Sequence, residues 1–418
     1  MEKITLINYG ISIVFAACFF YQFVYIGISL VRRRGHKLPD APPLPFAVLV
    51  CARNEEAVIG GLLASIRAQK YPSELLDIYV VADNCTDHTA QVARSMGAIV
   101  LERFDRERVG KGYALAYVLD HILAKEPNRY AGYFVFDADN VLDEHYVEEM
   151  NKTFFAGNRI VTSYRNSKNY ASSWISAGYS LWFLHEARHL NHPRMLLGTS
   201  CAVSGTGFLI HRDIVAKNNG WKHFLLTEDI EFTVDSILQG ERIGYCDSAV
   251  LYDEQPVKLT ASWNQRVRWT KGILQVQRRY GAALAKGMMR GSFACFDMLM
   301  ILLPPVVLMF IGLLANIGTL ALSALLMKAT TLTVVSSVLE MLSKAYLMFF
   351  AMGALTCLTE WKNIHCSVPR KLLSLVTFPL YMFTYIPISF AALFLKAEWK
   401  PVRHCIVRTP EEIRSGRL

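Results

Sequence analysis

The segment "YFVFDADN" (residues 133–140) decides the predicted fold. Its first four residues form a continuous apolar run, which is typical of a strand buried on both faces of a parallel sheet. Two carboxylates, Asp137 and Asp139, follow at a spacing of two, so both can lean toward one cation beyond the strand end. Such hard oxygen ligands suit Mg²⁺ or Mn²⁺ rather than zinc, although a lone acidic pair is also common in ordinary turns.

Three further apolar runs precede this segment, and each is followed by a stretch with helical character. They are "FAVLVCA" (46–52), "LDIYVVAD" (76–83) and "AIVLER" (98–103). We expect helices from about Glu55, from a cap near Asp87, after Lys111 and near Asp143. Strands that alternate with helices predict an α/β fold with a parallel sheet covered on both faces. No G-x-G-x-x-G follows the first strand and no Walker loop is present, which argues against a nicotinamide dehydrogenase or a P-loop ATPase.

Polar side chains follow three of these predicted strands. They are Asn54 and Glu55 after the first strand, Asp83 at the end of the second, and the two aspartates after the fourth. Ligands of open α/β sheets bind beyond the carboxyl ends of the strands. We therefore expect these groups to share one ligand-binding edge.

The chain is too apolar to be a purely soluble protein. It has 418 residues, of which 53% are hydrophobic, and its mean hydropathy is +0.25. The run 7–31 is long enough to cross a bilayer and is closed by Arg32, Arg33 and Arg34, so we expect an uncleaved anchor at 1–35 with its start outside the cell. The mixed segment 45–285 is then a cytosolic domain, and 286–396 holds membrane-spanning and interfacial helices.

Three apolar stretches follow the predicted cytosolic domain. Residues 299–327 and 332–358 are expected to span the membrane, and the second carries Glu340 and Lys344 at a helical spacing of four, either as a pore lining or as a simple pair. The stretch 372–395 contains Pro379 and Pro387 and precedes a basic tail, 397–418. A fourth span would put that tail outside, so we interpret this stretch as interfacial or re-entrant, although hydropathy alone predicts a span.

The distribution of charge and cysteine indicates the cellular compartment and the kinds of partner. The formal net charge is +9, and the basic residues cluster beside the apolar segments, which is typical of a cytosolic surface facing a membrane. No basic stretch carries the interleaved aromatic residues of a nucleic-acid module, so we expect no nucleic-acid partner. The nine cysteines are scattered and include no C-x-x-C pair, which favours a reducing compartment. The sequence predicts a multi-pass protein of the plasma membrane.

Two later segments carry groups suited to catalysis. In "LLTEDIEFTVDSI" (225–237), Thr227 is the expected helix cap, and Glu228 and Asp229 lie in the first turn, where the helix dipole favours ionised carboxylates. In "SWNQRVRWTKG" (262–272), an amide, a fixed cation and a flat ring lie within about one helical turn of each other. These are Gln265, Arg268 and Trp269. Each group is also compatible with ordinary capping or with a membrane-surface helix.

In this order and spacing, the motifs resemble those of the membrane-integrated family 2 glycosyltransferases, which include cellulose, hyaluronan and poly-N-acetylglucosamine synthases. The resemblance is carried by "CARNEE" (51–56), "VADNCTD" (81–87), "GKGYAL" (110–115), "FDADN" (136–140), "VSGTGFLIHR" (203–212), "TED" (227–229) and "QRVRW" (265–269). It implies a GT-A-type nucleotide-sugar-binding domain with a mostly parallel sheet, joined to α-helical transmembrane segments. It also implies a divalent cation, Mg²⁺ or Mn²⁺, as cofactor.

The resemblance implies a role for each matching residue on the donor side. Uridine would be held by Ala52, Glu55 and Asp83, and the donor phosphates would lie near Lys111. The diphosphate and the metal would be held by Asp137 and Asp139.

On the acceptor side, the resemblance implies a loop, a general base with an acidic neighbour, and a motif at the mouth of the acceptor channel. Asp229 corresponds to the base, and Glu228 belongs to the same catalytic motif. The acceptor residues are Ser204, Gly205, Thr206, Gln265, Arg268 and Trp269. The tail "EWKPVRHCIVRT" (398–409) lies where relatives have a short loop over the active site.

The implied reaction is an inverting transfer of a hexose or N-acetylhexosamine from a UDP-sugar to a growing β-linked polysaccharide, with possible coupling to export. Addition of one or a few sugars to a lipid acceptor is the alternative, because the predicted spans are few. A small membrane partner subunit is compatible with either product. The sugar and the linkage stay open at this point.

A third alternative comes from "HEARH" (185–189), which has the His-Glu-x-x-His spacing of a zinc peptidase. On a helix, His185 and His189 would share a face with Glu186 beside them. No extended His motif follows, since Asn191, His192 and Pro193 break the pattern. The peptidase would leave the acidic strand ends and the "QRVRW" segment unexplained, so it is the distant alternative.

Overall fold

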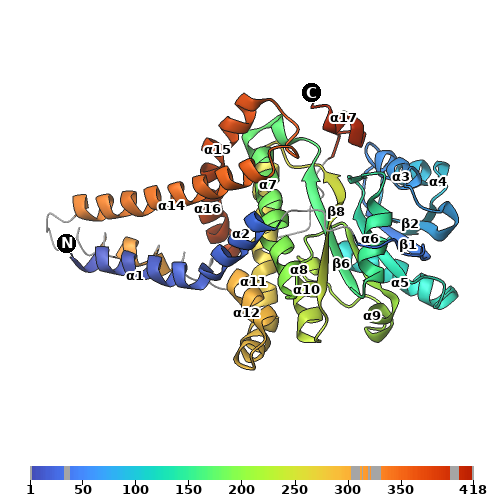
Figure 1. Ribbon diagram of the computed structural model, residues 1–418, viewed down its shortest axis with the longest axis horizontal. Helices are drawn as coiled ribbons and strands as arrows, with labels where there is room; N and C mark the ends of the chain where they lie inside the picture. The colour runs from blue at the N-terminus through green and yellow to red at the C-terminus, as the bar shows by residue number, and fades with distance from the viewer. Residues whose placement is uncertain are drawn as a thin grey trace.

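An eight-stranded mixed sheet organises the α/β part of the molecule (Figure 1). The computed structural model describes residues 2–32, 38–302, 311–312, 314–318, 321, 331–395 and 404–416. The strand order is β3-β2-β1-β4-β7-β6-β8-β5. The strands are β1 (Phe46–Ala52), β2 (Leu76–Asp83), β3 (Ile99–Arg103), β4 (Gly132–Asp137), β5 (Val141–Leu142), β6 (Ile160–Ser167), β7 (Phe208–His211) and β8 (Ile243–Asp253).

The four predicted strands form a parallel half-sheet. β1 pairs in parallel with β2 and β4, and β2 pairs in parallel with β3. The register places Cys51 opposite Asp137 and Ala52 opposite Ala82, so the carboxyl ends of β1, β2 and β4 meet at one edge. The other half is not purely parallel, because β7 runs antiparallel to β4 and β6 and β5 runs antiparallel to β8. The expectation of a mostly parallel sheet is confirmed, and these antiparallel pairings are the difference.

The sheet is covered by helices on both faces, as predicted. Along β1, Phe46, Val48 and Val50 belong to one apolar cluster, which also includes residues of α3 and α6. Ala47 and Leu49 belong to the opposite cluster, with residues of α5 and α7. This alternation is the period of two expected of a strand. The helices of this part are α3 (Ile59–Arg67), α4 (Thr89–Ser95), α5 (Lys111–Lys125), α6 (Tyr146–Phe155), α7 (Trp174–His185), α8 (His192–Leu197), α9 (Arg212–Lys217) and α10 (Glu228–Leu238).

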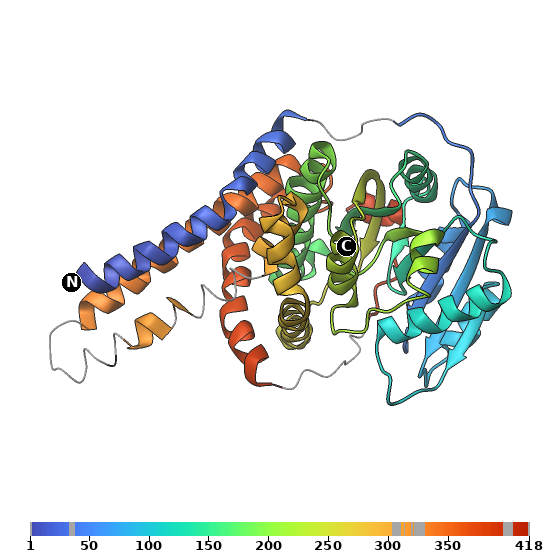
Figure 2. The ribbon, with the colours of Figure 1, turned by 90° about the horizontal axis from the view of Figure 1, so that it is seen from below.

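Long apolar helices project from the α/β part. Figures 1 and 2 both show α1 (Glu2–Phe19) and α14 (Thr331–Thr359) running together away from the sheet. The predicted anchor 7–31 is not one straight helix: it is bent by 46° between α1 and α2 (Tyr21–Val31). The predicted span 332–358 lies within α14, and most of the predicted span 299–327 lies outside the described residues.

The remaining helices lie beside the α/β part. They are α11 (Leu259–Met289), α12 (Phe293–Leu302), α15 (Val368–Phe383), α16 (Tyr385–Phe394) and the short α17 (Pro410–Arg414). Both views show α15 and α16 crossing the direction of α1 and α14. This crosswise course fits an interfacial segment, although 368–394 is long and apolar enough to span a membrane. Among the described residues, two helices pass that test, or up to three if the bent pair counts as one span.

The pair Glu340–Lys344 is formed, with Lys344 Nζ 2.6 Å from Glu340 Oε1. The hydroxyl of Tyr9 on α1 also donates to Glu340, at 3.1 Å. Both charged side chains are about half exposed, and they pair with each other within α14 and with Tyr9 of α1.

A buried polar cluster joins α2 to the α/β part. The guanidinium of Arg194 on α8 donates to both carboxylate oxygens of Asp297 on α12, at 2.7 and 2.9 Å. The hydroxyls of Tyr21 and Tyr25 on α2 donate to the same carboxylate, at 2.7 and 2.8 Å. Arg194 and Asp297 are only 1% and 0% exposed. Every acceptor of the carboxylate is therefore used, and three helices are tied together at one point.

We predict that Asp297→Ala destabilises the protein by about 3 to 5 kcal/mol, because it leaves the Arg194 charge buried without a partner. Thermal unfolding of the detergent-purified protein measures this loss. Lys70→Ala is the matched control, since its ion pair with Glu144 is exposed and contributes at most about 1 kcal/mol. Equal unfolding temperatures for the two variants would contradict the anchoring role of Asp297.

Candidate active site

A buried lysine lies at the centre of the strand edge. Lys111 is the first residue of α5, and its Nζ donates to the carboxylate of Asp137 at the end of β4. The same Nζ donates to the carbonyl oxygen of Gly205 at 2.7 Å. Although burial lowers the pKa of Lys111, the charges of Asp137 and Glu228 raise it above its ordinary value. Lys111 is therefore a fixed cation where the resemblance implies the donor phosphates.

Asp139 lies two residues after Asp137, the partner of Lys111, and its side chain is buried. Its Oδ2 accepts the backbone N–H of Glu254 at 2.8 Å. Burial raises the pKa of Asp139, but the charges of His404 and Lys168 outweigh burial and lower it. Asp139 is thus held as a carboxylate.

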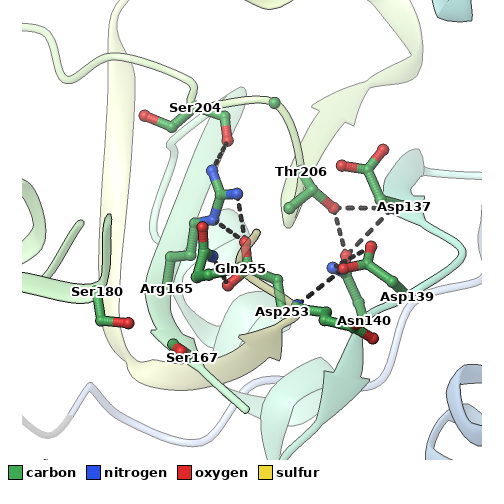
Figure 3. A network of polar contacts seen from close by, with 12 residues as sticks. Asp137, Asp139, Asn140, Arg165, Ser167, Ser180, Ser204, Thr206, Asp253 and Gln255 are labelled. Carbon is green, nitrogen blue, oxygen red and sulfur yellow. Dashed lines mark hydrogen bonds and ion pairs between the residues drawn. The ribbon is translucent and has the colours of Figure 1, made fainter. Parts of the chain in front are cut away.

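Thr206 connects this strand end to the predicted acceptor loop, residues 204–206 (Figure 3). Its hydroxyl accepts the backbone N–H of Asp137 at 2.9 Å and donates to Asn140 Oδ1 at 2.5 Å. Asn140 Oδ1 also accepts the N–H of Asp137, at 3.1 Å. The position of Thr206 therefore fixes the backbone that carries Asp137.

The predicted uridine residues lie at the ends of β1 and β2. Ala52 ends β1 and is buried, and Asp83 ends β2 and pairs with Arg103 at 2.6 Å. Burial raises the pKa of Asp83, and the hydrogen bond from Arg103 opposes this rise. Because Arg103 already uses one oxygen of Asp83, this carboxylate is held in place rather than free.

Glu55 is in contact with the chain's last described segment. The expected helix from Glu55 begins only at Ile59, so Glu55 lies in a turn, and its two oxygens lie 3.0 and 3.1 Å from His404 Nδ1. The backbone N–H groups of Cys405 and Ile406 donate to Glu254. Although burial lowers the pKa of His404, Asp139 and Glu55 raise it to about 10. The tail therefore adds a positive charge to the donor side.

Glu228 and Asp229 begin α10, next to the acceptor loop. Asp229 Oδ2 would lie 3.8 Å from a methyl group placed on Gly205. Burial raises the pKa of Asp229, with Lys111 and Arg268 opposing it, and burial together with the charge of Asp229 raises the pKa of Glu228 to about 7. Thr227 occupies the N-cap position, but the predicted capping hydrogen bond from its side chain is absent.

Glycines at positions 205 and 207 allow the tight backbone course of the loop Ser204–Thr206. Gly205 and Gly207 have φ angles of 78° and 68°, a left-handed conformation that favours glycine. A methyl group on Gly207 would lie 1.9 Å from the side chain of Leu251, so the loop backbone passes against β8 without room for a side chain. This close approach explains the "SGTG" sequence.

The three residues of the "QRVRW" segment differ in their surroundings. Arg268 lies near the carboxylates of α10 and donates to the Leu226 carbonyl at 3.4 Å. Gln265 Oε1 is buried and has no hydrogen-bond partner among the described residues. Trp269 packs edge-on against Tyr179 and Phe183, so it belongs to an aromatic cluster with α7. The structure brings Arg268 to the predicted base, whereas Trp269 is engaged elsewhere.

The "HEARH" segment does not have the geometry of a zinc site. His185 and His189 bond to Thr356 and Thr359 of α14, both at 3.1 Å, and His189 also bonds to Ser29 of α2 at 2.7 Å. Burial lowers the pKa of His185 to about 4 and that of His189 to about 3, so both rings are neutral. Over the described ranges, no cluster of three or more His, Cys, Asp or Glu side chains could hold a metal.

Several residues near the aspartates were missed by the sequence analysis. Arg165 on β6 donates to the carboxylate of Asp253 at the end of β8 and to the Ser204 carbonyl, at 2.6 and 2.9 Å. Lys168 and His404 supply charge to Asp139. The run "SAVLYDE" (248–254) carries the same signal as the other strand ends, an apolar run closed by acidic residues, and could have identified Asp253. Nothing local marks Arg165 or His404.

The two aspartates of the strand edge suit a divalent cation that shares its ligands with a substrate. Mg²⁺ and Mn²⁺ sites of this kind use one or two carboxylates and complete their shell with phosphate oxygens and water. Asp139 is ionised by its surroundings, and Asp137 is held by Lys111 at the solvent side. A cation held by protein side chains alone would need more ligands than these two.

Comparison with known proteins identifies the family and the fold. Residues 42–272 match the family described as "Glycosyltransferase like family 2". The chain is 28% identical over 295 residues to a beta-monoglucosyldiacylglycerol synthase of Nostoc, which covers 66% of this chain and 59% of that protein. It is 25% identical over 269 residues to a poly-beta-1,6-N-acetyl-D-glucosamine synthase of Staphylococcus aureus, with 62% of each chain covered.

One solved structure resembles almost the whole chain. It is the mannosyltransferase PcManGT from Pyrobaculum calidifontis in complex with GDP-Man and Mn²⁺, with a TM-score of 0.58 and 17% sequence identity, covering 94% of this chain and 99% of that one. This likeness establishes the GT-A-like fold. Since the match to the family spans more than half of the chain, from before β1 into α11, the protein belongs to glycosyltransferase family 2 and is a glycosyltransferase.

Proposed function

We propose that the protein is an inverting glycosyltransferase that uses a UDP-sugar, with Asp229 as general base. The observation that carries this proposal is the single loop at Gly205, which contacts Lys111 through its carbonyl and has Asp229 as its neighbour on the other side. Lys111, beside the predicted diphosphate site, and Asp229, the predicted base, thus both lie next to Gly205. An acceptor hydroxyl between them would have its proton accepted on one side and the departing charge neutralised on the other.

In the proposed reaction, Asp229 takes the proton of the acceptor hydroxyl as its oxygen forms a bond to C1 of the donor sugar. The bond from C1 to the diphosphate oxygen breaks, and UDP leaves with the bonding electrons. One displacement inverts the anomeric configuration. Lys111 and Arg268 neutralise charge around the pair, and a divalent cation held by Asp137 and Asp139 would supply Lewis-acid stabilisation of the leaving diphosphate.

We propose the remaining sequence assignments on the same basis. Ala52, Glu55 and Asp83 lie at the ends of neighbouring parallel strands, where a nucleoside fits in this class of sheet. Ser204, Gly205 and Thr206 form the acceptor side with Gln265, whose buried and unpartnered oxygen is suited to a sugar hydroxyl. Glu228, beside Asp229, completes the catalytic motif. The domain faces the cytosol, where UDP-sugars are made, and the helices anchor it in the plasma membrane.

Two acceptor classes are compatible with this site. A growing β-linked polysaccharide is the first, because Gln265, Arg268 and Trp269 lie on α11, which packs against α16 next to the projecting helices. A lipid acceptor is the second, and two observations favour it: the sequence predicts few spans, and the Nostoc relative is named for a glucosyldiacylglycerol product. A small partner subunit is compatible with either class.

The experiment that tests this proposal measures sugar transfer by the purified protein in lipid nanodiscs with Mn²⁺ or Mg²⁺. We would supply radiolabelled UDP-glucose, UDP-N-acetylglucosamine and GDP-mannose, with dioleoylglycerol present or absent, and determine the size of the labelled product. Label of high molecular weight identifies a polysaccharide synthase, and label that extracts into organic solvent identifies a glycolipid transferase. Transfer that persists in EDTA contradicts the requirement for a divalent cation. Absence of transfer from all three donors contradicts the proposed reaction.

We predict that Asp229→Asn lowers the transfer rate at least 100-fold, because the amide cannot accept the acceptor proton. UDP binding, measured by isothermal titration with Mn²⁺, is expected to change less than threefold. The matched control is Asp235→Asn on the same helix, since Asp235 pairs with His223 and Lys222 away from the loop. Near-normal turnover by Asp229→Asn would remove this residue from the base role.

We also predict an acid limb in the pH profile of transfer. The base acts only when ionised, and burial raises the pKa of Asp229, so activity should fall already at a pH above the ordinary range of an aspartate. The rate at saturating donor and Mn²⁺, measured between pH 4 and 9, tests this expectation. A rate that stays constant down to pH 4 would contradict the raised pKa.

A further inference from the structure

Glu186, the acid of the "HEARH" segment, is directed toward the acceptor loop. Ser204 Oγ donates a hydrogen bond to Glu186 Oε1 at 2.8 Å, across 18 residues of sequence. The two residues also line one small cavity together with Arg165 and Thr206. The carboxylate that a peptidase would use beside its zinc is therefore bonded to the glycosyltransferase loop.

Ser204 is held from two sides. Its hydroxyl bonds to Glu186, and its carbonyl oxygen accepts Arg165 Nη1 at 2.9 Å. Arg165 is itself fixed by Asp253, which also accepts Gln255 Nε2 at 2.5 Å, and its guanidinium lies 3.7 Å from the centre of the Phe183 ring. Of the two groups that hold Ser204, Glu186 belongs to the π-helix that follows α7, and Arg165 belongs to the sheet.

The next two residues of the loop, Gly205 and Thr206, bond to Lys111 and Asp137 on the predicted donor side. The Gly205 carbonyl accepts Lys111 Nζ, and the Thr206 hydroxyl accepts the N–H of Asp137. A shift of Ser204 therefore displaces the partners of both Lys111 and Asp137. The charge of Asp229 also raises the pKa of Glu186, after the larger effect of burial, which indicates that the two carboxylates are within electrostatic range.

Glu186 is the first residue of a π-helix. The α-helix α7 ends at His185, and Glu186–Asn191 continues as a π-helix, a form that is often found at functional sites. The flanking histidines face α2 and α14 instead, through Ser29, Thr356 and Thr359. The π-helix is thus fixed to the projecting helices on one side and to the acceptor loop on the other.

We propose that Glu186 is a positioning residue that holds Ser204 and thereby sets the geometry of the acceptor loop during transfer. It does not need to touch either substrate. This inference rests on the proposed function for its kinetic consequence, but the loop geometry can be measured without any substrate.

The direct test is hydrogen–deuterium exchange of the full-length protein in nanodiscs. Glu186→Ala is expected to increase amide exchange at least tenfold in peptides covering residues 203–207, whereas Glu186→Gln, whose carbonyl still accepts the Ser204 hydroxyl, restores it to within threefold. Glu241→Gln is the matched control, because Glu241 bonds to Arg159 at the opposite end of β6 and β8. Unchanged exchange in Glu186→Ala, or an equal increase in the strands of the sheet, would overturn the positioning role.

The kinetic test uses the donor and acceptor that give transfer in the nanodisc panel. Glu186→Ala and Ser204→Ala should each lower kcat about tenfold while KM for the UDP-sugar changes less than twofold, and the double variant should be no worse than either single variant. Multiplicative losses in the double variant would overturn the proposal. If the wild-type protein transfers no sugar, the proposed function fails, and the exchange measurement still decides the role of Glu186.

Discussion

A single, largely buried ammonium group connects the two parts of the proposed active site. Lys111 Nζ donates to Asp137 on one side and to the Gly205 carbonyl on the other, so one cation is shared by the end of β4 and the loop before β7. A buried lysine is stable only if opposite charge and hydrogen bonds offset its desolvation. This requirement forces α5 to begin at the strand edge, and it forces the loop backbone to present a carbonyl oxygen there. The glycines of the loop allow that close approach.

The same constraint explains why so many charges surround this edge. Beyond Lys111, the predicted donor side contains Arg165, which is paired with Asp253, and His404, which is paired with Glu55. Lys168 lies within electrostatic range of Asp139 and donates to the Ile406 carbonyl. A nucleoside diphosphate brings two or more negative charges, and a cation would bring two positive ones. An array of paired groups can exchange partners with such ligands at low cost, because no isolated charge is created at any step. The array therefore suits a site that is repeatedly loaded and emptied.

The sequence was informative where the structure depends on local patterns. β1, β2 and β4 end within one or two residues of their expected positions, because a continuous apolar run closed by polar or charged residues has few alternatives. The antiparallel β7 and the bend between α1 and α2 were not predicted, since both depend on contacts with distant parts of the chain. The pairing of His404 with Glu55 spans 349 residues, and no local signal exists for a contact of that kind.

The "HEARH" segment illustrates the same limit from the opposite direction. Its spacing was a strong local signal for a metal site, yet the two histidines and the glutamate all bond to neighbouring elements: His185 to α14, His189 to α2 and α14, and Glu186 to the predicted acceptor loop. Buried polar groups must find hydrogen-bond partners, and a helix wedged between membrane-proximal helices and a sheet has different partners on each face. A motif with two histidines and a glutamate can therefore arise from packing demands alone. What distinguishes it from a zinc site is that both histidines bond to threonines of α14 while Glu186 bonds to Ser204.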